Sequence, residues 1–127
     1  MSRRLGSSNP AVHSQVVLSR HYFRSLELWI REGDVVGQTF EALGLAMALA
    51  SLGRDETALR LEGAIDATWE ELGIAVRPRV VETWRERDLG AASDRLGEAR
   101  AAALYEAGRA LGWEQALELA MGATPRG

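Results

Sequence analysis

The chain has 127 residues, enough for one domain with a modest core but not for two. Hydrophobic residues make up 46% of it, which excludes a wholly disordered chain, and the net charge of −3 disfavours a nucleic-acid binder, whose affinity depends on basic contacts with phosphate. Because there is no cysteine, there can be no disulfide, thiol nucleophile or thiolate metal site.

The two ends of the sequence predict little regular structure. Residues 1–10 are polar and are expected to form a flexible lead-in, although Asn9 and Pro10 have the pattern of a helix cap followed by proline in the first turn. Residues 123–127 are expected to form a frayed tail, which leaves residues 11–122 as one helical domain. The start lacks the apolar segment of a signal peptide, and no apolar run approaches the ~20 residues that span a bilayer. We therefore expect a cytoplasmic protein.

The first predicted element is an amphipathic helix from Ala11 to about Arg31, because apolar residues recur at steps of three and four. Gly33 is expected to end it, and Asp34 to cap the next helix. The apolar residues of the first helix are Val12, Val16, Tyr22, Phe23, Leu26, Trp29 and Ile30.

The stretch EALGLAMALASLGRDETALRLEGAID, residues 41–66, could form one long helix or two. One helix would have to accommodate SLGRDE in mid-span. We therefore predict a helix from Val35 to about Leu52, a left-handed stop at Gly53, and a new helix from about Glu56 to Leu72 with Asp55 as its cap.

Three further helices are predicted from the rest of the chain. Pro78 opens one that runs to about Leu96, in which Gly90 favours a kink or a break. Gly97 precedes an alanine-rich helix to about Leu111, and a short helix covers 113–121. No segment alternates as a strand does, so the predicted fold is all-α with about six helices.

No residue pattern points to catalysis, a metal or a cofactor. His13 and His21 lie eight residues apart, whereas metal-binding histidines on a helix prefer a spacing of three or four. Asp66, Glu70 and Glu71 form an acidic cluster that we interpret as a solvated helix face. We therefore predict that the chain is not an enzyme.

Small residues in the middle of the chain follow the spacing of a tetratricopeptide repeat, a pair of helices in ~34 residues. Ala46 and Ala58 would let the two helices approach closely, and Gly53 would turn the chain. Residues 25–73 and 95–120 resemble the C-terminal helical region of large bacterial signalling ATPases and transcriptional regulators, including LuxR-type and adenylate-cyclase-linked ATPase proteins. The phrases GRDETALRLEGA and EAGRALGWEQALELA carry most of this resemblance.

The resemblance implies antiparallel helix hairpins of the α-solenoid type that act as a sensor or scaffold. The chain lacks a phosphate-binding Gly-Lys-Ser/Thr loop, a cyclase motif and a recognisable helix-turn-helix reader. ATP hydrolysis, cyclase activity and DNA binding are therefore not implied for it.

In tetratricopeptide arrays the first helix of each pair lines the concave face, so the resemblance implies that Phe40, Leu43, Met47 and Ala50 line a groove. Three alternatives stay open for this apolar stripe. The C-terminal helices could fold back over it, two copies could pair through it, or it could bind an apolar peptide helix.

The first helix favours pairing. By the same resemblance it is the second helix of a repeat whose first helix is missing, so its stripe has two sides to cover and one obvious neighbour. We therefore expect a homodimer, with Tyr22, Phe23 and Leu26 among its contacts.

The sequence thus predicts a non-catalytic tetratricopeptide-like interaction module of a bacterial signalling or transcriptional regulator. Its partner would be another protein or a second copy, without direct contact to nucleic acid or membrane. The alternative is a helical domain that senses a small molecule in a pocket among Trp69, Trp84 and Tyr105.

Overall fold

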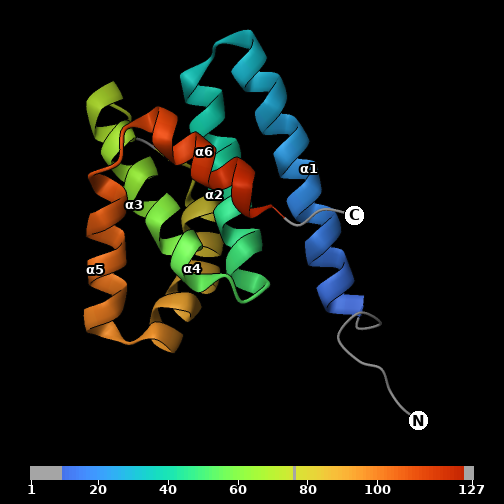
Figure 1. Cartoon of the computed structure of the whole chain (residues 1–127), viewed down its shortest axis with the longest axis vertical. Helices are drawn as coiled ribbons and strands as arrows, with labels where there is room; N and C mark the ends of the chain where they lie inside the picture. The colour runs from blue at the N-terminus through green and yellow to red at the C-terminus, as the bar shows by residue number, and fades with distance from the viewer. Residues whose placement is uncertain (1–9, 76, 125–127) are drawn as a thin grey trace.

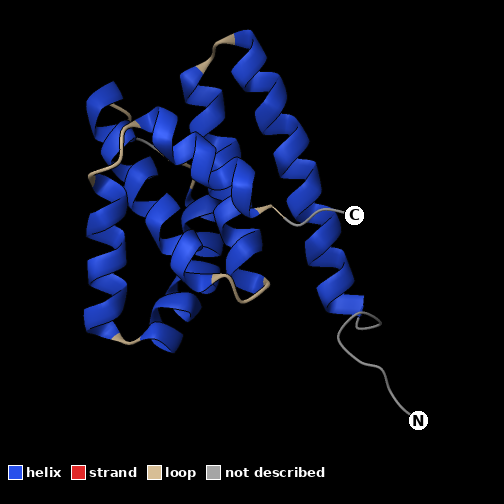
Figure 2. Ribbon diagram, viewed as in Figure 1, coloured by secondary structure: helices blue, strands red, loops and turns tan. Residues whose placement is uncertain are grey.

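The computed structural model describes residues 10–75 and 77–124, and every regular element in them is an α-helix (Figures 1 and 2). The prediction of an all-α fold with about six helices is confirmed. The predicted cap at Asn9 and most of the predicted tail lie outside the described residues. The helices are α1 (Pro10–Glu32), α2 (Val35–Ser51), α3 (Asp55–Leu72), α4 (Arg79–Leu96), α5 (Glu98–Arg109) and α6 (Trp113–Ala123).

The first two turns lie where the glycines predict them. Gly33 has φ +75° and Gly53 has φ +85°, a backbone conformation that favours glycine. Asp34 caps α2, since its carboxylate accepts a hydrogen bond from the Gly37 amide at 3.0 Å. The stretch at 41–66 is therefore two helices folded back against each other, as predicted.

Two local predictions are wrong. Asp55 does not cap α3, because it is the first residue of that helix and its carboxylate instead forms an ion pair with Arg95 of α4 at 2.8 Å. Helix α4 is not broken near Gly90, since its helical hydrogen bonding continues from Arg79 to Leu96. A single glycine weakens a helix by only about 1 kcal/mol, which packing of α4 on its neighbours can offset.

Helix α2 lies at the centre of the fold. Every residue from Ala42 to Ala50 is buried, because α1, α3, α4 and α6 all pack against α2. Helix α4 also packs on α3, and α6 crosses back over α3 and α2 rather than extending the stack of helices (Figure 1). The solenoid-type arrangement that the resemblance implies stays a prediction.

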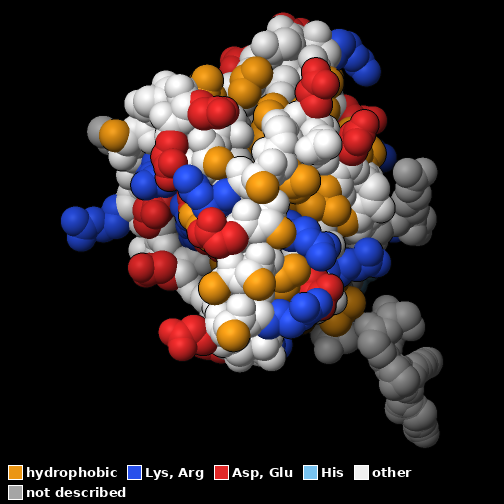
Figure 3. All heavy atoms as spheres, turned by 60° about the vertical axis from the view of Figure 1, so that its left-hand side comes forward, with side chains coloured by type: hydrophobic (Ala, Val, Ile, Leu, Met, Phe, Trp, Pro, Cys, Tyr) orange, Lys and Arg blue, Asp and Glu red, His pale blue; other side chains and the backbone are white. Residues whose placement is uncertain are grey.

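Helices α3 and α5 approach each other most closely at two glycines. A Cβ atom on Gly108 would overlap the Arg60 carbonyl oxygen, and one on Gly63 would overlap the Tyr105 carbonyl oxygen. Ion pairs flank this contact, Arg100 to Glu56 at 2.6 Å and Arg109 to Glu70 at 2.8 Å. Figure 3 shows acidic and basic side chains close together on this side of the molecule.

Candidate interaction surface

Helix α1 packs against α2 and has little contact with any other helix (Figure 1). Two glycines of α2 make this packing close: the ring of Tyr22 occupies the space where Gly44 would carry a Cβ, and the ring of Trp29 does the same at Gly37. Leu26 is fully buried in this contact. One side of α1 is therefore fixed against the core, and no other described helix covers the opposite side.

The uncovered side of α1 carries large apolar side chains. Val17, Leu18 and Leu28 are 50%, 39% and 57% exposed. At 3.6 residues per turn these three positions fall within about 100° of one another around the helix, so they form one face. We call Val17, Leu18 and Leu28 the outer face of α1. Large exposed apolar patches mark interaction sites, and this face is the candidate for one on α1.

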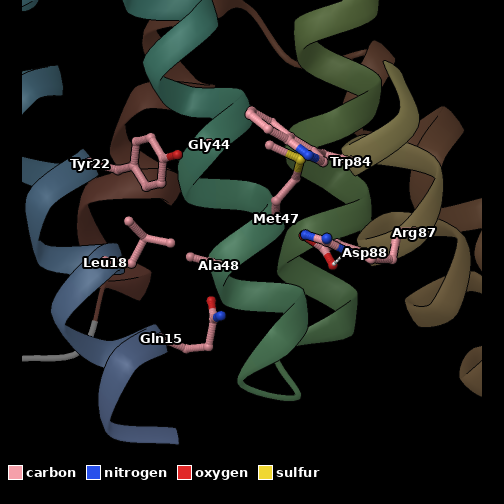
Figure 4. Close-up of a pocket in the computed structure, with 9 residues that line it drawn as sticks. All are labelled: Gln15, Leu18, Tyr22, Gly44, Met47, Ala48, Trp84, Arg87 and Asp88. Atoms are coloured by element: carbon pink, nitrogen blue, oxygen red, sulfur yellow. Dashed lines mark hydrogen bonds and ion pairs between the residues drawn. The ribbon is translucent and has the colours of Figure 1, made fainter. Parts of the chain in front are cut away.

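A groove of ≈ 230 Å³ runs beside this face, between α1 and α4, with α2 as its floor (Figure 4). Leu18 and Tyr22 form the α1 wall, and Trp84, which is 45% exposed, stands on the α4 wall. Burial raises the pKa of Tyr22, and the carboxylates of Glu41 and Asp88 raise it further, so its phenol stays neutral. The lining residues are Gln15, Leu18, Tyr22, Gly44, Met47, Ala48, Trp84, Arg87 and Asp88.

Of the predicted groove residues, only Met47 and Tyr22 line this groove. Leu43 and Ala50 are each 1% exposed, because the other helices of the same chain surround α2, and Phe40 packs its ring against Trp69 at 5.1 Å. Leu43 and Ala50 therefore lie in the core of the described structure rather than along an open groove.

On α1, Leu26 is a core residue rather than a surface contact, and Phe23 is half-buried outside the groove.

The three aromatic residues of the alternative ligand pocket line three different cavities, so they do not form one pocket. The buried Trp69 donates its indole N–H to Thr39 Oγ1 at 2.8 Å. Trp84 faces the groove beside α1, and the Tyr105 hydroxyl donates to Asp66 Oδ2 at 2.6 Å. The structure therefore places these three side chains, from α3, α4 and α5, at different cavities and does not bring them together in one of them.

An ion-pair cluster centred on Arg85 is a feature that the sequence patterns do not reveal. The Arg85 guanidinium donates to Glu62 Oε2 at 2.8 Å and to Asp66 Oδ2. Burial by itself would lower the pKa of Arg85, but hydrogen bonds to Asp66 and Glu62 raise it above its ordinary value. Burial, followed by the bond to Asp66, raises the pKa of Tyr105 to about 12. Asp66 thus belongs to a partly buried network and not to the predicted solvated face.

Charge is unevenly distributed along the chain. The first 26 residues hold four arginines and no acidic residue, whereas the other 101 residues hold all 18 acidic residues and 11 arginines, a net charge of −7. In α1, Arg20 and Arg24 form no ion pair with any described residue, while most arginines of α4 and α5 are paired. The first acidic residue of α1 is Glu27. The N-terminal half of α1 is therefore cationic, and its C-terminal half carries charges of both signs.

These features define an all-α chain whose first helix presents an apolar face that no other described helix covers and cationic groups without an ion-pair partner in the described part of the chain. No protein-family model matches the chain, and no curated protein or solved structure shows significant similarity to it. Across residues 10–75 and 77–124, no helix combines the length and apolar character needed to cross a bilayer.

Proposed function

We propose that this chain is a non-catalytic interaction and regulatory module that pairs with a second copy of itself through α1. The observation that carries the proposal is the outer face of α1, which is apolar and covered by no other helix among the described residues. The resemblance of residues 25–73 and 95–120 to bacterial signalling and transcriptional regulators supports a tetratricopeptide-like module of such a regulator.

Charge complementarity favours a second copy as the occupant. Most homodimers have a two-fold axis, and an axis perpendicular to α1 would run the two copies of α1 antiparallel to each other. With that axis near residue 26, Arg20 and Arg24 of each copy come level with the segment of the other copy that holds Glu27 and Glu32. Leu28 of each copy then packs near the centre of the contact, and Trp84 and the groove lie at its edge.

Replacing Leu28 with glutamate should weaken this dimer at least about tenfold, because burying a leucine side chain contributes about 1.5–3 kcal/mol and each 1.4 kcal/mol is a factor of ten. Light scattering and sedimentation equilibrium over a range of concentrations measure the effect. Val80→Glu is the matched control, since Val80 is 50% exposed on α4 and outside the outer face. Its dimer should keep the parent's dissociation constant.

The dependence of the dimer on salt separates the electrostatic contribution to pairing from the hydrophobic one. Raising the ionic strength should weaken the parent dimer, because Arg24, Glu27 and Glu32 are solvent-exposed in the single chain and charges of this kind are screened within a Debye length of about 8 Å at physiological salt. A parent chain that sediments as a monomer at all concentrations, or a Leu28→Glu variant that pairs as tightly as Val80→Glu, would refute the proposed homodimer.

A further inference from the structure

A buried glutamine on α2 connects two helices, α1 and α6, that have little direct contact with each other. Gln38 is 5% exposed. Its side-chain amide donates a hydrogen bond to the carbonyl oxygen of Trp29, in the last turn of α1, at 3.2 Å. The same amide accepts a hydrogen bond from the indole N–H of Trp113, the first residue of α6, at 2.9 Å. Gln38 therefore bridges the C-terminal end of α1 and the N-terminal end of α6.

The chemistry of the two partners fixes the orientation of this amide. An indole N–H can only donate and a carbonyl oxygen can only accept, so the amide oxygen of Gln38 faces Trp113 and its amide nitrogen faces Trp29. A leucine at position 38 would make neither bond, and an ionised glutamate would lack the donor. Each of the two bonds thus holds the amide in the position that the other bond needs.

The carbonyl oxygen of Trp29 belongs to the anchor that holds the end of α1. It also accepts a hydrogen bond from the Asp34 amide at 3.1 Å, and the Trp29 ring packs closely against Gly37. Leu28, a member of the outer face of α1, directly precedes Trp29 in the chain. Loosening of this anchor therefore changes how firmly α1 presents its outer face.

We propose that Gln38 couples the docking of α6 to the anchoring of α1. When α6 leaves its place on α2 and α3, the buried amide oxygen of Gln38 loses its donor, and a buried polar atom without a partner is costly. Rotation of the side chain towards solvent gives that oxygen a new partner but breaks the bond to Trp29. Release of α6 thus loosens the end of α1, and loosening of α1 weakens the docking of α6 by the same factor, because coupling between two sites is reciprocal.

Amide hydrogen exchange tests this coupling. The amides of Gly33 and Asp34 donate to carbonyl oxygens in the last turn of α1, so their exchange rates report how firmly that turn is held. Trp113→Phe keeps an aromatic ring but removes the N–H, and it should speed the exchange of both amides about three- to tenfold, the factor that corresponds to the loss of one hydrogen bond. In a chain that already carries Gln38→Leu, the same substitution should leave the two rates unchanged.

Arg54→Ala is the matched control. Arg54 donates a hydrogen bond to the carbonyl oxygen of Ala123 at 3.1 Å, at the other end of α6, so its loss frays α6 without displacing Trp113. It should change the two exchange rates by less than about twofold, because the bridge at Gln38 stays intact. NMR measures all the rates in the Leu28→Glu background, so that they report on the single chain whether or not the parent pairs. Circular dichroism verifies that each variant is folded.

The proposal is overturned if Trp113→Phe leaves both exchange rates unchanged, if it acts equally in the presence of Gln38→Leu, or if Arg54→Ala has the same effect. The consequence for pairing rests on the proposed function. Without the Leu28→Glu substitution, Trp113→Phe should raise the dissociation constant of the dimer, and a dimer of unchanged affinity would overturn that consequence. A parent chain that never pairs would refute the proposed function alone, since the exchange rates decide the coupling independently.

Discussion

Replacing Gly108 with alanine should lower the free energy of unfolding by about 3 kcal/mol, near the upper end of the cost of overpacking a core. The reason is the crossing of α3 and α5, where the added methyl group would overlap the backbone carbonyl of Arg60. A flexible side chain could move aside, but a helical carbonyl moves only if the two helices separate. The free energy of unfolding of a small domain is about 5–15 kcal/mol, so Gly108→Ala would remove a large share of the total stability.

Gly90→Ala is the matched control for Gly108→Ala. Gly90 also lies inside a helix, but a Cβ there would meet no atom within 4 Å. The same substitution should therefore raise the free energy of unfolding by about 1 kcal/mol, through the higher helix propensity of alanine. Urea unfolding followed by circular dichroism measures both variants. Equal stabilities for the two would show that α3 and α5 do not meet at Gly108.

The sequence predicts the turns well because their causes are local. A left-handed glycine and a capping aspartate act within a few residues of the chain, so Gly33, Asp34 and Gly53 could be assigned without knowledge of any neighbour. The first turn of α1 is similar, since Pro10 begins that helix as predicted. Asp55 shows the limit of this approach: it has the residue type of a cap, but Arg95, 40 positions away, pairs with its carboxylate.

The candidate sites could not be predicted to the same extent, because they depend on which helices meet. The apolar stripe of Leu43 and Ala50 is equally compatible with an open groove and with a core, and only the packing of α1, α3, α4 and α6 on α2 decides between them. Tyr105 and Asp66 are 39 residues apart, and no periodic pattern relates them. By contrast, the sequence analysis expects one obvious neighbour for α1, and among the described residues α2 is the helix against which α1 packs.

Replacing Arg85 with alanine should lower the free energy of unfolding at neutral pH by about 3 kcal/mol, because removing one partner of a largely buried ion pair leaves the other charge uncompensated. Arg85 is 11% exposed, and it is hydrogen-bonded to Glu62 and Asp66, which are 18% and 15% exposed. Its guanidinium also lies 5.9 Å from the Trp69 ring centroid, so the variant loses packing as well. Arg87→Ala is the control: Arg87 is 68% exposed and, among the described residues, pairs only with its neighbour Asp88, so its loss should change stability by less than about 0.5 kcal/mol.

The loss of stability in Arg85→Ala should depend on pH, because it depends on whether Glu62 is protonated. Burial raises the pKa of Glu62, and Arg85 opposes that rise, so the pKa should be higher still in the variant. A carboxyl group whose pKa is higher in the folded state binds more protons there. Its contribution to stability is therefore present at low pH and is lost as the pH rises through the folded-state pKa. The deficit of the variant relative to the parent should be largest at neutral pH and should shrink as the pH is lowered and Glu62 becomes protonated. Urea unfolding of both proteins over a series of pH values measures this difference, and a deficit that grows on acidification would mean that Glu62 is not the group left unpaired.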